Sequence, residues 1–111
     1  MTSKILHSDF AKLDLRVGKI IEIEEHPNAD KLYILKVDLG EEEPRHIVAG
    51  LRPYYNPSDL LNKKAIFAAN LEPAKIRGIE SNGMILAADN SNGKVIFLTT
   101  EKEIDVGSKI R

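Results

Sequence analysis

The 111-residue chain has a net charge of −1, with 42% hydrophobic residues, 30% charged residues and no cysteine. These values are typical of one folded domain, residues 1–111, and exclude a disordered tail, a disulfide-stapled domain and a uniformly basic nucleic-acid-binding protein. No apolar run approaches the roughly 20 residues of a membrane span, and the first residues lack signal-peptide features. We therefore expect no membrane contact and a cytoplasmic location.

Charge is distributed unevenly along the chain. Residues 22–43 carry eight acidic against two basic side chains, whereas residues 44–79 carry six basic against two acidic. An ordinary solvated surface could produce the same division, so charge alone does not identify a binding site.

The first predicted elements are a short amphipathic turn at residues 8–12 and a long strand. Apolar residues fall on odd positions from Leu13 towards Ile23, the period of a strand with one buried face. Gly18 marks a point where such a strand could bulge or bend around a barrel.

A second strand is predicted at residues 32–39, where Tyr33 and the alternate residues after it are apolar. The turn at residues 26–30 joins it to the first strand, so the two should form a hairpin. Residues 46–49 predict a short third strand.

The alternating pattern breaks between residues 51 and 62. Pro53 and Pro57 exclude a long regular element there, and Ser58-Asp59 could cap a single helical turn. Such an insert would plug one end of a barrel. Alternation returns at residues 65–69, which predict a fourth strand.

The last strands are predicted at residues 84–88 and 95–98, with a hairpin turn at Asn92-Gly93 between them. About five short strands and one helical insert predict an all-β, five-stranded Greek-key barrel of the oligonucleotide/oligosaccharide-binding (OB) type, with extra elements at the termini. A small SH3-like barrel is the alternative.

Catalytic and metal-binding patterns are weak. The three histidines lie in different segments, and none has the spacing of a metal-ligand pair. His26 is interpreted as part of a turn in which Asn28 and Asp30 satisfy backbone donors. Ser81 lacks the preceding glycine that a nucleophile elbow requires. The sequence indicates no enzyme, no metal site and no cofactor.

The stretch from Leu71 to Ala88 carries the strongest binding pattern. Lys75 and Arg77 are two residues apart, which places them on the same side of an extended backbone. With Lys31 at the start of the second strand, they are predicted to meet on the open face of the barrel. Guanidinium and ammonium groups arranged in this way bind phosphate.

Three further residues could contact a nucleic acid. Ser81 or Asn82 could contact a base edge or a ribose hydroxyl, while Met84 could support a base or fill the core. Aromatic residues make up only 5% of the chain. Because single-strand binders usually stack bases on several rings, we expect recognition of a folded RNA by its shape.

Three motifs resemble the tRNA-binding domain family: LDLRVGKI at residues 13–20, HPNADKLYILKVDLG at 26–40 and NLEPAKIRGIESNGMILAA at 70–88. That family includes the C-terminal domain or separate beta subunit of methionyl-tRNA synthetases and stand-alone structure-specific tRNA-binding proteins. The resemblance implies an OB barrel that grips the outer corner of tRNA with little sequence preference and assists an aminoacyl-tRNA synthetase.

The family pattern also implies which residues line the tRNA-contacting groove. They come from the second and third motifs and are Asn28, Lys31, Lys75, Arg77, Ser81 and Met84.

The resemblance further implies a homodimer, with residues 95–110 and the first residues building the interface, and a methionyl-tRNA synthetase catalytic subunit as a possible partner. It does not separate a beta subunit from a stand-alone binder. A secretion-related chaperone branch shares the barrel and the dimer and is the alternative, although the turn HPNADKL at residues 26–32 resembles the synthetase branch.

Overall fold

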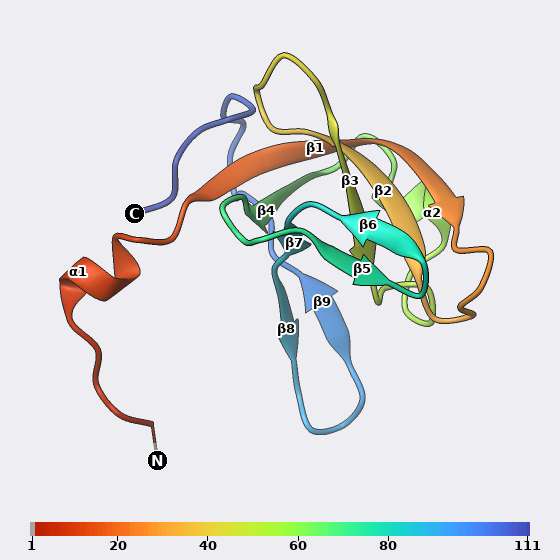
Figure 1. Cartoon of the computed structure of the whole chain (residues 1–111), viewed down its shortest axis with the longest axis horizontal. Coiled ribbons are helices and arrows are strands. Elements are labelled where there is room, and N and C mark those ends of the chain that lie inside the picture. Colours follow the sequence, from red (N-terminus) through yellow and green to blue (C-terminus); the bar gives the residue numbers. More distant parts are fainter. Residues whose placement is uncertain (1) are drawn as a thin grey trace.

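One long strand, β1 (Leu15–Glu25), organises the computed structural model, which describes residues 2–111 (Figure 1). It pairs antiparallel with both β2 and β4. The five-stranded sheet has the order β3-β2-β1-β4-β7, formed with β2 (Tyr33–Asp38), β3 (Arg45–Ala49), β4 (Lys64–Ala68) and β7 (Met84–Ile85). This sheet confirms the predicted five-stranded OB-type barrel.

Smaller elements complete the fold. The helical turn α1 (His7–Phe10) precedes the barrel, and a second helical turn, α2 (Pro57–Leu60), lies between β3 and β4. Two separate two-stranded ribbons flank β7 in the sequence. The first consists of β5 (Ala74–Ile76) and β6 (Ile79–Ser81), and the second of β8 (Ala87–Asp89) and β9 (Val95–Phe97). In the described part of the chain, neither helix has the length or apolar character to span a membrane.

The core lies inside the rolled sheet and is filled by alternate residues of its strands. The largest fully buried side chains are Phe67, Ile20, Leu35, Leu39, Ile47, Leu60, Val17 and Val37. Leu60 comes from α2, and its buried position confirms a short helical insert packed against the barrel. Burial of this apolar surface is the main stabilising contribution.

Gly18 serves close packing and does not mark the bulge. A Cβ built there would lie 2.7 Å from Leu39 Cδ2 and 2.7 Å from Phe67 Cδ1. The irregularity in β1 instead falls between Ile20 and Glu22, where the register with β2 shifts. The interpretation of Gly18 as a possible bulge is therefore wrong, and close packing against Leu39 and Phe67 is what excludes a side chain there.

The predicted strand at residues 84–88 is divided into β7, which pairs with β4, and β8, which pairs with β9. The β8–β9 hairpin is present, but its turn is longer than Asn92-Gly93. Asn90 Oδ1 accepts hydrogen bonds from the backbone N–H groups of Asn92 and Lys94, both at 3.0 Å. An asparagine side chain that satisfies the backbone in this way stabilises a wider turn.

Ser81 helps to close the barrel between β3 and the segment before β7. Its side chain is 3% exposed, and its Oγ accepts the N–H of Val48 at 3.0 Å and donates to the carbonyl of Gly83 at 3.1 Å. The N–H of Asn82 donates to the carbonyl of His46 at 2.9 Å. The Ser81 hydroxyl thus accepts the Val48 N–H in place of a strand carbonyl, at the junction between β3 and residues 81–83, which we call the barrel seam.

Replacing Ser81 with alanine should therefore destabilise the fold. The variant leaves the buried N–H of Val48 without this acceptor, which costs about 1–3 kcal/mol. Urea denaturation should show the loss, with Ser91→Ala, on the exposed β8–β9 turn, as the control. Equal midpoints for the two variants would show that the Ser81 hydroxyl does not support the seam.

An arm formed by residues 2–14 leaves the barrel (Figure 1). The Asn70 side chain holds its base, because Asn70 Oδ1 accepts the N–H of Asp14 at 2.8 Å and Nδ2 donates to the carbonyl of Lys12 at 2.6 Å. Farther out, Ile5 and Leu6 are 68% and 71% exposed. The arm therefore has a fixed base and an apolar outer part that the other described residues, 2–111, leave exposed.

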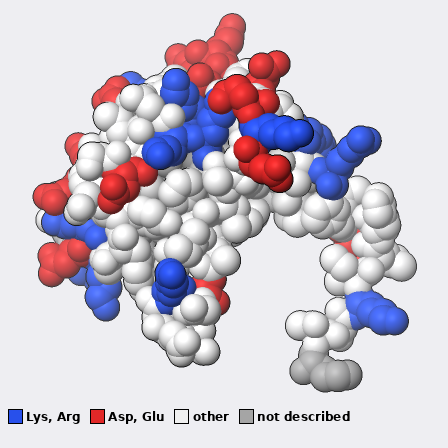
Figure 2. Space-filling model, turned by 180° about the vertical axis from the view of Figure 1, so that it is seen from behind, with Lys and Arg blue, Asp and Glu red and all other residues white. Residues whose placement is uncertain are grey.

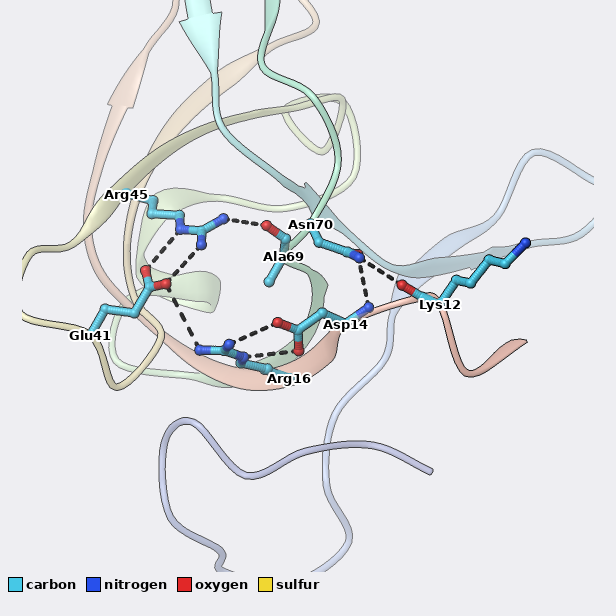
Figure 3. Close-up of polar contacts among 7 residues, drawn as sticks. All are labelled: Lys12, Asp14, Arg16, Glu41, Arg45, Ala69 and Asn70. Atoms are coloured by element: carbon cyan, nitrogen blue, oxygen red, sulfur yellow. Dashed lines mark hydrogen bonds and ion pairs between the residues drawn. The ribbon is translucent and has the colours of Figure 1, made fainter. Parts of the chain in front are cut away.

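A network of ion pairs lies beside this base (Figure 3). Arg16 makes two hydrogen bonds to Asp14, at 2.9 and 2.7 Å, and its Nη1 lies 3.8 Å from Glu41 Oε2. Arg45 makes two hydrogen bonds to the same Glu41, at 2.8 and 2.7 Å, and a third to the carbonyl of Ala69. The hydrogen bonds from Arg16 and Arg45 lower the pKa values of Asp14 and Glu41, respectively.

This network should make the fold less stable in acid. A carboxylate with a lowered pKa in the folded chain stabilises it fully above the ordinary pKa of about 4, and that contribution disappears as the pH falls through the lower folded value. We expect a loss of about 1 kcal/mol between about pH 5 and pH 3, because the pairs are partly exposed.

The double variant Asp14→Asn, Glu41→Gln should flatten the urea midpoint against pH in this range. The control is Asp89→Asn with Glu42→Gln, which changes exposed carboxylates that make no ion pair within residues 2–111. Identical profiles for the two double variants would contradict a role for the network.

Candidate nucleic-acid interface

Two loops far apart in the sequence meet at the end of β1. The loop between β1 and β2, residues 26–32, lies against the β5–β6 ribbon (Figure 1). Arg77 Nη2 donates to the carbonyl of Asn28 at 3.0 Å, and His26 Nε2 lies 3.0 Å from the carbonyl oxygen of Ile76. The second and third sequence motifs are therefore joined directly by these contacts.

The β5–β6 ribbon was not predicted as a pair of strands. Its turn consists of Arg77 and Gly78, with φ values of +52° and +91°, between the paired residues Ile76 and Ile79. Positive φ at both central residues is the geometry of a type I′ hairpin turn. The prediction that Lys75 and Arg77 share one side of an extended backbone is therefore wrong, because Arg77 occupies the turn.

The β1–β2 loop is held by backbone and side-chain contacts. The N–H of His26 donates to the carbonyl of Leu32 at 3.1 Å, and the N–H of Leu32 donates to that of Ala29 at 3.3 Å. Arg52 Nη1 also donates to the carbonyl of Ala29 at 3.3 Å. The N–H of Asn28 donates to His26 Nδ1 at 3.0 Å, so an imidazole, and not an Asn or Asp side chain, satisfies this donor.

The cations of the two loops are exposed and are not held in ion pairs within the described residues. Lys31, Lys75 and Arg77 make no ion pair within residues 2–111, whereas Arg16 and Arg45 share Glu41. Arg77 commits Nη2 to a backbone carbonyl and retains other N–H donors. A cation that is not held in an ion pair attracts phosphate more strongly than a cation within one.

The remaining predicted site residues lie differently. Met84 is 47% exposed on β7, so it is not a core filler. Ser81 is buried and its hydroxyl is engaged at the barrel seam, which keeps it from the surface. Asn28 is exposed and adjoins Arg77. Asn28, Lys31, Lys75 and Arg77 therefore share the two joined loops, while Met84 lies on the neighbouring barrel strand.

Sequence reasoning missed His26 and Arg52 as organisers of the loop. Arg52 pairs with Glu25 at 3.2 Å in addition to its bond to Ala29. A histidine between a strand and a proline gave a turn signal, but nothing in the local spacing pointed to a partner 50 residues away. Within residues 2–111, no group of three or more His, Asp or Glu side chains could hold a metal ion.

A family model described as a putative tRNA-binding domain matches residues 15–109. The chain belongs to the tRNA-binding domain family. This confirms the family that the three motifs indicated. The methionine–tRNA ligase of Pyrococcus horikoshii is 63% identical over 103 residues, and that of Methanosarcina mazei is 51% identical over 105 residues. These matches cover 93% and 95% of this chain but only 14% and 15% of the ligases.

Solved structures of family relatives have the same fold. A MetRS-related protein from Pyrococcus horikoshii superimposes with a TM-score of 0.92 at 34% identity, covering 99% of this chain and 100% of that one. The CsaA chaperone protein from Picrophilus torridus superimposes with a TM-score of 0.88 at 33% identity, covering 97% and 100%. The tRNA-binding domain fold is therefore common to a synthetase-related protein and to a chaperone.

Proposed function

We propose that this domain binds tRNA by its shape, without strong sequence preference, and grips the outer corner of the molecule. The observation that carries the proposal is the Arg77–Asn28 contact, which joins two loops bearing three exposed cations that make no ion pair within residues 2–111. The domain would have no catalytic role of its own. It would act in the cytoplasm as a beta subunit or trans-acting cofactor of methionyl-tRNA synthetase, a role supported by its likeness to part of the ligases.

The backbone at Arg77 supports a binding role for its side chain. A left-handed conformation costs a residue with a Cβ about 1–2 kcal/mol, and asparagine or glycine is preferred at this point of the turn. Arg77 has φ +52° despite this preference. Strained residues of this kind cluster at functional sites, where the side chain is needed more than local stability.

Five of the six predicted groove residues would contact tRNA. Lys31, Lys75 and Arg77 would bind phosphate oxygens, Asn28 would bind the sugar-phosphate backbone, and Met84 would pack against a base or ribose. Ser81 would contribute indirectly, by shaping the bend before Met84.

A second copy of the chain would cover the apolar arm. Figure 2 shows the arm standing off from the barrel across an open hollow with few charged side chains on its walls. Exposed apolar residues occur on the arm and after β8 and are Ile5, Leu6, Phe10, Ile96, Leu98 and Ile104. Apolar patches of this kind often mark protein interfaces. Sedimentation with and without tRNA should give a dimer in both cases, and a monomer at micromolar concentration would contradict the proposal.

A chaperone function is the second candidate, favoured by the structural likeness to the CsaA chaperone. Retention of bulk tRNA on filters and suppression of aggregation of a denatured client protein distinguish the two. We expect tRNA retention that is lost at high salt and little effect on the client. Salt-insensitive client protection without tRNA retention would favour the chaperone and reject tRNA binding.

A further inference from the structure

The His26 imidazole is buried between the two loops of the proposed site and is 3% exposed. Both of its ring nitrogens are engaged: Nδ1 accepts the N–H of Asn28, and Nε2 lies 3.0 Å from the carbonyl oxygen of Ile76. Because a carbonyl can only accept, Nε2 carries the proton and the ring is the neutral tautomer. One side chain therefore contacts the backbone of both loops.

The positions of these two contacts matter for the cations. Asn28 lies three residues before Lys31, in the β1–β2 loop, and Ile76 lies between Lys75 and Arg77. A bond to the Ile76 carbonyl therefore fixes the backbone that carries both cations of the ribbon. The β5–β6 ribbon forms a separate two-stranded sheet that is anchored to β3 at its Ser81 end, so the placement of its turn against the loop depends on contacts such as this one.

We propose that His26 is a positioning residue for the nucleic acid, a role that rests on the proposed function. It holds the β1–β2 loop against the β5–β6 ribbon, so that Lys31 binds phosphate together with Lys75 and Arg77. The RNA then meets a preorganised set of cations and does not have to order two independent loops on binding. The contact through Nε2 carries this coupling, because it alone joins the ring to the ribbon.

Two amide substitutions separate the functions of the two ring nitrogens. A glutamine places an N–H donor near the position of Nε2 and can retain the bond to the Ile76 carbonyl. An asparagine places an acceptor near Nδ1 and can retain the bond from the Asn28 N–H, but it is too short to reach the ribbon. His26→Asn should therefore loosen the loop from the ribbon and leave the Arg77–Asn28 bond as the remaining link, whereas His26→Gln should keep the imidazole's link to the ribbon.

The test is a mutant cycle read by filter binding of bulk tRNA at low salt. Wild type, His26→Asn and His26→Gln are each measured with and without Lys31→Ala, and a urea midpoint for each variant shows that it is folded. We expect His26→Asn to bind about tenfold more weakly and His26→Gln to stay within about threefold of wild type. Lys31→Ala should weaken binding less in the His26→Asn background than in the wild type.

A purely structural role for His26 predicts a different result. His26→Asn would then lower the urea midpoint but leave the tRNA affinity of the folded protein unchanged. Lys31→Ala would weaken binding equally in both backgrounds. That result would overturn the proposal. If His26→Asn does not fold, a folded His26→Gln that binds tRNA about tenfold more weakly than the wild type, although it can retain the bond to the Ile76 carbonyl, would overturn it equally. If the folded wild-type protein retains no tRNA on the filter, the proposed function itself is wrong. The positioning role of His26 would then be rejected with it.

Discussion

Replacing Lys75 with alanine and Arg77 with asparagine together is expected to weaken tRNA binding about 100-fold at low salt. Each substitution removes a charged hydrogen bond to phosphate worth about 1.5 kcal/mol or more, and about 1.4 kcal/mol corresponds to a tenfold change in affinity. Both side chains are exposed and lack a carboxylate partner within residues 2–111, so the protein itself loses no ion pair.

Asparagine is chosen at position 77 because it tolerates the left-handed backbone that Arg77 adopts, with φ +52°. The double variant should therefore unfold at a urea concentration no lower than the wild type, although it loses the bond from Arg77 to Asn28. The affinity for tRNA, measured by filter binding, should therefore fall while the urea midpoint does not. A matched control, Lys94→Ala with Lys102→Ala, removes the same charge from exposed positions outside the two loops. Equal affinity for the control and the site variant would show that only net charge matters.

Replacing Phe67 with alanine is expected to have the largest effect on stability, about 3–5 kcal/mol. Phe67 is fully buried on β4 and lies between Arg16 of β1 and Ile85 of β7 in the sheet register. Since small domains are stable by about 5–15 kcal/mol, this single loss would leave the variant marginal. Urea denaturation measures it, and Phe67→Leu, which retains more volume, should lose clearly less. A loss below 1 kcal/mol for Phe67→Ala would contradict the packing described.

Gly18 provides an independent check on the same contact. Its substitution by alanine would bring a Cβ within 2.7 Å of the Phe67 ring and of Leu39, so about 1–3 kcal/mol should be lost through overpacking. In a Phe67→Leu background, part of the obstructing ring is absent and the loss should shrink. Additive effects of the two substitutions would show that Gly18 and Phe67 do not share this space.

The barrel could be predicted because its strands obey a simple period. In β2, alternating Tyr33, Leu35 and Val37 are buried, and this period of two is visible in the sequence alone. The prediction was weaker where pairing depends on distant partners. The β5 and β6 strands have three residues each, too few to establish a period, and their turn contains Arg77 where asparagine is typical.

The sequence indicated the cations of the candidate site but not the residues that position them. Lys31, Lys75 and Arg77 stood out through charge and through the family motifs, and Asn28 does adjoin Arg77. His26 and Ser81 were assigned to a turn and to the RNA surface, respectively, yet both are 3% exposed and bridge separate segments. Long-range hydrogen bonds by single side chains leave no periodic trace, so only the tertiary structure shows them.

The central claim is that loop and ribbon cations together bind the phosphates of tRNA. The salt dependence of tRNA affinity tests it most directly, because each phosphate contact releases counterions and adds about 0.7–0.9 to the slope of log affinity against log salt. We expect a steep, linear slope for the wild type and a slope flatter by about 1.5 for the Lys75→Ala, Arg77→Asn variant. A flat wild-type response, or the same slope for both proteins, would contradict it.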